Sequence, residues 1–82
     1  MDDTNALTYI LRTQSNEYYC GKTININDRL QTHKLSRKGW FCSASRRNFK
    51  LLYLFTGNYE KTIKRAGIKL IVNLLNNIKM KG

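Results

Sequence analysis

The sequence predicts an α+β domain in which helices cover a small β-sheet, in the order β-β-α-(α)-β-α. This fold class is predicted by two short aromatic and β-branched runs, a later apolar run and two segments with helical spacing. The 82 residues suffice for one hydrophobic core, so residues 1–82 are expected to form a single domain. Residues 1–6 are expected to be a flexible N-terminus.

The first half of the chain reads as a β-hairpin followed by a helix. Residues 7–12, LTYILR, and residues 17–22, EYYCGK, have the composition of strands. The polar cluster at residues 14–16, QSN, is typical of the turn between them. Asn25 is a candidate N-cap, so a helix is predicted from there to about Leu35.

The second half is expected to add one strand and one long helix. Residues 36–48 are basic and irregular, with a short helix predicted at about residues 40–45. Residues 50–55, KLLYLF, form a nearly continuous apolar run that is typical of a strand buried on both faces. A last helix is predicted over about residues 59–78. Its apolar stripe would comprise Ile63, Leu70, Ile71, Leu74 and Ile78.

The charge balance indicates a polyanionic partner. Fifteen Lys and Arg residues face five Asp and Glu residues, which gives a formal net charge of +10. Neutralising phosphates with these cations releases counterions, so nucleic acid is the expected partner. No apolar run has the length of a membrane span, and the first residues do not resemble a signal peptide. We therefore expect an intracellular protein, cytoplasmic or nucleoid-associated, with no membrane partner.

The two cysteines do not suggest a metal site. Cys20 and Cys42 have no second pair nearby and no metal-type spacing. We expect two reduced, partly buried thiols rather than a disulfide or a zinc site.

Five side chains in the first half are suited to a phosphate diester. Tyr9 and Tyr19 are expected at corresponding positions of two paired strands, and Lys22 follows a glycine directly. Arg29 and His33 are four residues apart and therefore lie on one face of a helix. A guanidinium can clamp phosphate oxygens, and a phenol or imidazole can move a proton. Each residue alone is a weak signal, and the joint spacing carries the prediction.

With these motifs the chain resembles the GIY-YIG endonuclease family over nearly its whole length. Residues 7–9, LTY, stand where the first signature triplet would be, and residues 19–21, YCG, where the second would be. The continuation GKTININDRLQTH is similar to the family's Gly-Lys-Thr, Arg-Leu and His segment. Leu7 and Thr8 depart from the signature, replacing Gly and Ile. The resemblance implies a three-stranded antiparallel sheet flanked by helices, cleaving DNA with one divalent metal, Mg²⁺ or Mn²⁺.

The resemblance also implies a role for each of these side chains. Tyr9 would be the general base or would position the attacking water, its pKa lowered by adjacent cations. Tyr19 would hydrogen-bond the same phosphate or water, with Lys22 nearby. Arg29 would stabilise charge that develops on the phosphoryl oxygens. His33 would assist the proton relay or contact the phosphate, and a purely structural role in the helix is the alternative.

The metal-binding residue implied by the resemblance is missing. The family's glutamate lies on the last major helix, three and four residues before an apolar pair, here residues 70–71. This register places the metal position at Gly67, and shifted registers place it at Ala66 or Arg65; none of these side chains binds a cation. Glycine inside a helix also costs about 1 kcal/mol relative to alanine. Glu60 is a conceivable substitute, although the helix dipole already explains an acid in a first turn.

A basic segment interleaved with aromatic residues is the predicted DNA-contacting surface. Trp40 is expected to be partly buried, and the alternative for the cations is that they are merely solvated. The predicted DNA-contacting residues are Lys34, Arg37, Lys38, Trp40, Arg46, Arg47 and Lys50.

Together these observations predict a metal-dependent DNA endonuclease, in a form that would be inactivated at the metal position. The alternative is a non-catalytic nucleic-acid-binding module on the same scaffold. A third interpretation, an unrelated small basic RNA-binding α+β protein, requires the Tyr9, Tyr19, Arg29 and His33 spacing to be coincidental.

Overall fold

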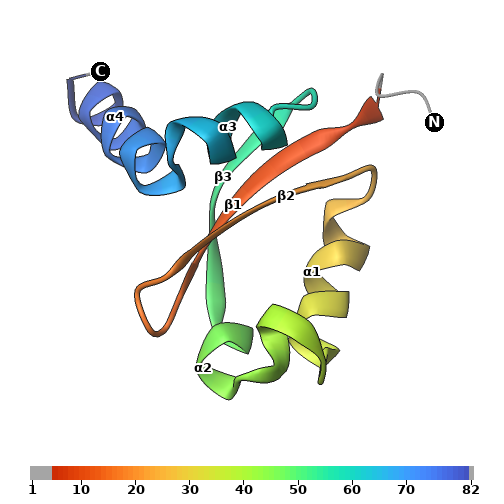
Figure 1. Ribbon diagram of the computed structural model, residues 1–82. Helices are drawn as coiled ribbons and strands as arrows, with labels where there is room; N and C mark the ends of the chain where they lie inside the picture. The colour runs from red at the N-terminus through yellow and green to blue at the C-terminus, as the bar shows by residue number, and fades with distance from the viewer. Residues whose placement is uncertain (1–4, 82) are drawn as a thin grey trace.

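The protein folds as a three-stranded antiparallel sheet with helices on both faces, which confirms the predicted α+β class (Figure 1). The computed structural model describes residues 5–81, with side chains described for residues 5–79. The elements in order are β1 (Leu7–Thr13), β2 (Tyr18–Thr23), α1 (Ile26–Leu35), the 3₁₀ helix η2 (Gly39–Cys42), α2 (Ala44–Arg47), β3 (Phe49–Thr56), α3 (Glu60–Ala66) and α4 (Ile68–Lys81). Among these elements, no helix is long and apolar enough to cross a membrane.

The N-terminal segment that was expected to be flexible lies mostly outside the described residues. Within it, Ala6 is buried, and its carbonyl accepts a hydrogen bond of 2.8 Å from the backbone N–H of Gly57. Ala6 therefore belongs to the folded part of the chain.

The central strand is β1, because the sheet order is β2-β1-β3. Tyr9, Ile10 and Leu11 of β1 are each at most 1% exposed, since both neighbouring strands and both helical layers cover them. The prediction that residues 50–55 form a strand buried on both faces is wrong. β3 is an edge strand, in which Leu51 is 40% and Leu54 is 45% exposed. An apolar run marks a strand but does not show how many neighbours that strand will have.

The two faces of the sheet carry separate cores. Ile10 and Cys20 face α3 and α4, where Ile63 and Val72 complete one buried cluster. The opposite face packs against the layer made by α1, η2 and α2, which lies on the other side of the sheet from α3 and α4 (Figure 1). Its buried members are Tyr9, Leu11 and Phe41.

The single last helix predicted over residues 59–78 is wrong, because the helix is interrupted at Gly67. Gly67 has a φ of 103°, so α3 ends at the residue before it and α4 begins at the residue after it. The cost of a glycine inside a helix therefore does not apply at this position.

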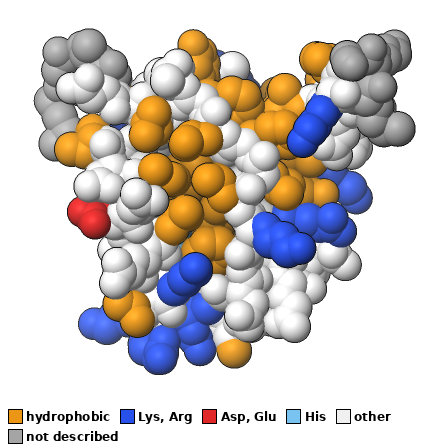
Figure 2. All heavy atoms as spheres, turned by 180° about the vertical axis from the view of Figure 1, so that it is seen from behind, with side chains coloured by type: hydrophobic (Ala, Val, Ile, Leu, Met, Phe, Trp, Pro, Cys, Tyr) orange, Lys and Arg blue, Asp and Glu red, His pale blue; other side chains and the backbone are white. Residues whose placement is uncertain are grey.

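The buried side of α4 differs from the predicted stripe. Val72 is buried, whereas Leu70, Leu74 and Ile78 of the predicted stripe are each at least half exposed. Figure 2 shows the rear face of the whole molecule, where hydrophobic side chains gather near the middle and Lys and Arg lie beside and below them. The predicted stripe is thus only partly a core surface.

Candidate functional site

The N-cap of α1 directs two candidate side chains toward the sheet. The side chain of Asn25 accepts a hydrogen bond of 3.1 Å from the N–H of Asp28, which confirms the predicted cap. Because the helix starts there, Arg29 and His33 lie on the same side of α1, one turn apart. His33 is only 7% exposed, although it lies on a helix whose other residues are mostly exposed.

Tyr9 and His33 meet in the interior. The Tyr9 Oη and the His33 Nε2 form a buried hydrogen bond of 2.8 Å, which joins the central strand to α1. Tyr9 lies opposite Gly21 in the strand register, and Tyr19 lies opposite Leu11. The expectation that Tyr9 and Tyr19 occupy corresponding positions is therefore wrong by two residues. Their side chains still share a face, with ring centroids 6.1 Å apart.

Aromatic rings surround the His33 imidazole. The ring of Phe41 stacks on it with centroids 4.0 Å apart, and Tyr19 meets it edge-on at 5.3 Å. Trp40 extends the cluster, with its ring centroid 5.2 Å from that of Tyr19. Sequence reasoning did not predict this role for Phe41, whose only signal was its position in an aromatic pair beside Trp40.

Burial keeps the Tyr9–His33 pair neutral. Burial, and secondarily the neighbouring Tyr19, raises the pKa of Tyr9 well above its usual range, and the Arg29 charge offsets only part of this. Burial likewise lowers the pKa of His33, and Arg29 lowers it further. The expectation that adjacent cations lower the pKa of Tyr9 is therefore contradicted, because desolvation of the phenolate dominates.

The other two predicted catalytic cations are exposed. Arg29 acts electrostatically on both Tyr9 and His33, so its guanidinium is close to the pair. Lys22 lies opposite Thr8 in the register, and strand alternation places both on the sheet face opposite to Tyr9. The structure thus brings Tyr9, Tyr19, Arg29 and His33 together and leaves Lys22 on the other face.

Thr8 has a structural role that the sequence did not reveal. Its hydroxyl donates to the carbonyl of Gly57 at 2.7 Å and accepts from the N–H of Tyr59 at 2.8 Å. These bonds fasten the loop before α3 to the central strand. A polar residue inside the apolar run LTYIL was the one available signal.

All three predicted DNA-contacting arginines make contacts within the protein, and Arg37 donates to the backbone carbonyls of Leu35 and Ser36. Arg46 donates to both carboxylate oxygens of Glu17, at 3.0 and 2.9 Å, and its guanidinium lies 4.6 Å from the ring centroid of Trp40. Arg47 donates to the backbone carbonyls of Ser36, Phe41 and Cys42, the last at 2.7 Å. Trp40 is partly buried, as expected. The exposed cations of the predicted surface are Lys34, Arg37, Lys38 and Lys50.

The residues present do not fit a divalent metal at the expected position. Gly67 offers no side chain, and its φ of 103° would strain any other residue placed there. Ala66 and Arg65 are exposed at the end of α3 and offer no oxygen ligand. The Glu60 carboxylate pairs with the ammonium group of Lys64 at 3.5 Å. Within the described part of the chain, no three His, Cys, Asp or Glu side chains lie together as a metal cluster.

Both cysteines are free thiols in the structure. Cys20 is fully rather than partly buried, and burial raises its pKa to about 11. Cys42 is exposed rather than partly buried, since it ends η2 at the protein surface.

Comparison with known proteins agrees with the motifs and the fold. The family model described as the GIY-YIG catalytic domain matches residues 5–74. Neither the search of curated proteins nor the search of solved structures finds a significant match. The matched segment begins just before β1 and extends into α4, so it contains the whole sheet and the Tyr9–His33 pair. The chain therefore belongs to the GIY-YIG family, whose members are of a nuclease type.

Proposed function

We propose that this domain binds DNA at the surface beside Tyr19 and Arg29, and that it is a form of the nuclease inactivated at the metal position. The observation that carries the proposal is the backbone at Gly67. Its φ of 103° breaks the helix that should present a glutamate, and no carboxylate replaces one at residues 65–67. The phosphate-binding half of the site is retained and the metal-binding half is lost.

The retained half is suited to contacting a phosphate without transferring a proton. Tyr9 is 1% exposed and neutral, so its hydroxyl is committed to His33 and holds α1 against the sheet. Tyr19 is partly exposed and Arg29 is exposed, so both can reach a phosphate oxygen from the protein surface. A guanidinium forms strong charge-assisted hydrogen bonds to phosphate, and the phenol adds a neutral donor.

The electrostatics of the whole domain favour the same partner. The net charge of +10 attracts a polyanion. The basic segment contributes four exposed cations, three before Trp40 in the chain and one after it. They are Lys34, Arg37, Lys38 and Lys50.

The test combines a DNA-binding assay with a nicking assay on supercoiled and branched DNA in Mg²⁺ or Mn²⁺. The wild-type protein should bind DNA without nicking it, and Arg29→Gln should weaken binding by about tenfold. A protein that binds neither DNA substrate would refute the proposal.

Two glutamate variants probe the metal position. Ala66→Glu keeps helical backbone geometry, whereas Gly67→Glu must occupy a left-handed conformation and should lower stability by about 1–2 kcal/mol. We therefore expect nicking to be restored by Ala66→Glu more readily than by Gly67→Glu. If both variants fold and bind DNA but neither cuts, the domain is a non-catalytic binding module rather than an inactivated nuclease.

A second candidate function is an active endonuclease in which Glu60 substitutes for the missing glutamate. It is favoured by one observation: the negative charge of Glu60, across the sheet from Tyr9, makes a small contribution to raising the pKa of Tyr9. Wild-type nicking that disappears in Glu60→Gln, with DNA binding unchanged, would establish this function in place of the first.

A further inference from the structure

Two cations lie directly opposite each other at the end of the sheet near the β1–β2 turn. Arg12 of β1 and Lys50 of β3 are register partners, so their side chains leave the same face of the sheet. Both residues are exposed. Like charges at directly opposed positions repel, and an anion bound between them would relieve the repulsion.

The described part of the protein supplies no such anion. Its two ion pairs join Glu17 to Arg46 and Glu60 to Lys64, and neither involves Arg12 or Lys50. The Arg12 guanidinium instead donates to the side-chain oxygen of Asn16 at 2.8 Å. A neutral amide orients the guanidinium without neutralising it.

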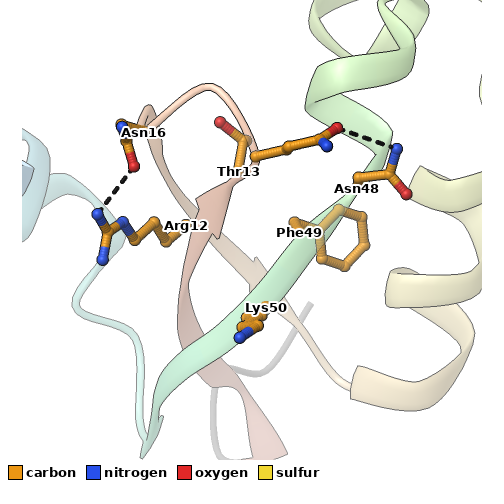
Figure 3. Close-up of a pocket in the computed structure, with 7 residues that line it drawn as sticks. Arg12, Thr13, Asn16, Asn48, Phe49 and Lys50 are labelled. Atoms are coloured by element: carbon orange, nitrogen blue, oxygen red, sulfur yellow. Dashed lines mark hydrogen bonds between the residues drawn. The ribbon is translucent and has the colours of Figure 1, made fainter.

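A hollow of about 470 Å³, lined by Arg12, Lys50 and other residues of the β1–β2 turn and the start of β3, lies at this pair. Figure 3 shows Arg12 reaching toward Asn16 on one side of the hollow, with Phe49 and Asn48 on the other and Lys50 below. The backbone N–H of Gln14 donates to the carbonyl of Asn48 at 2.7 Å, which joins the hairpin turn to the start of β3. The hollow therefore has a fixed wall, two cations and no acidic side chain in its lining.

We propose that this hollow holds a phosphate of a nucleic-acid strand between Arg12 and Lys50. The guanidinium and the ammonium would share its charge, and the amide groups of the wall would donate hydrogen bonds to its oxygens. The proposal assigns Arg12 a phosphate-binding role that the sequence motifs do not assign. It also names the group that Lys50 binds, a phosphate shared with Arg12.

The hollow adjoins the Tyr9–His33 pair through one residue. Phe49 lines the hollow, and its ring meets that of His33 edge-on with centroids 6.4 Å apart. Strand alternation, however, places the side chains of Arg12 and Lys50 on the sheet face opposite to Tyr9, so the hollow is a contact point separate from Arg29. This inference rests on the proposed DNA binding and adds a second contact point to it.

The experiment measures DNA affinity as a function of salt concentration for the full chain. The double variant Arg12→Gln/Lys50→Gln should bind duplex DNA about tenfold more weakly, with a salt slope smaller by about one. The matched control Lys61→Gln/Lys69→Gln removes the same charge from exposed positions of α3 and α4 and should bind like the wild type. Because Arg12→Gln/Lys50→Gln removes a repulsion, its thermal unfolding temperature should be no lower than that of the wild type.

Each outcome decides the proposal. Equal losses in the two double variants would overturn it, because net charge alone would then explain the binding. If the wild type binds no DNA, the proposed function fails independently. Titration with inorganic phosphate, followed by the side-chain NMR signals of Arg12, then decides the hollow itself. If the Arg12 signals shift, the hollow binds free phosphate, and the proposal that its phosphate comes from nucleic acid is overturned. If the Arg12 signals do not shift, the hollow is not an anion site.

Discussion

Gly21→Ala should damage the site by displacing Tyr9. Gly21 lies directly opposite Tyr9 in the register of β1 and β2. A Cβ added at Gly21 would lie 2.3 Å from the Tyr9 Oη and 2.4 Å from its Cζ, far inside van der Waals contact. The ring has no space to retreat, because Tyr9 is 1% exposed and packs against Tyr19 and His33.

Two terms set the magnitude of the loss. Inserting one methyl group into a packed core costs about 1–3 kcal/mol. Shifting the ring also breaks the buried Tyr9–His33 hydrogen bond, which costs about 1–3 kcal/mol when both partners stay buried. The two terms overlap, since one ring movement causes both, so we expect a total loss of about 2–4 kcal/mol in the free energy of unfolding.

Urea unfolding of a double-mutant cycle provides the assay. Tyr9→Leu removes the aromatic ring and should cost about 2–4 kcal/mol by itself. In Gly21→Ala/Tyr9→Leu the new methyl group occupies vacated space, so the double variant should cost at least about 1 kcal/mol less than the sum of the single variants. Additive losses would refute the reasoning, because they would show that the alanine does not act through the Tyr9 ring.

Three further predictions concern burial. The pKa of His33 is lowered in the folded protein, so the unfolded chain binds more protons below about pH 6.5. The free energy of unfolding should therefore decrease as the pH is lowered through this range. Urea unfolding at about pH 7.5 and about pH 5.5 should show a smaller decrease for His33→Gln than for the wild type. Val72→Ala should cost about 2 kcal/mol, whereas Leu74→Ala should change stability by less than about 0.5 kcal/mol, measured by the same unfolding. Mass spectrometry after alkylation of the folded protein should find Cys42 modified and Cys20, with its pKa of about 11, unmodified until unfolding.

The hairpin and α1 could be predicted from sequence because their signals are local. The turn cluster at residues 14–16 and the N-cap at Asn25 act within a few residues, and the structure places both as expected. The Arg29–His33 spacing depends only on helical periodicity, so it too was correct.

The edge position of β3 and the break at Gly67 could not be predicted in the same way. The number of neighbours of a strand is set by the tertiary arrangement, and the run KLLYLF fits an edge as well as a centre. A glycine within a helical pattern is compatible with a continuous helix or with a break, and here the left-handed backbone decides for the break.

Sequence reasoning brought the candidate site residues together but did not give their burial, and burial decides what they do. Tyr9, His33 and Gly21 form one packing unit, in which glycine leaves room for a tyrosine ring that fastens α1 to the sheet. Residues 7–9 and 19–21, the segments that carry the family signature, thus stabilise the fold whether or not a metal binds. Their packing role therefore does not depend on a carboxylate at residues 65–67.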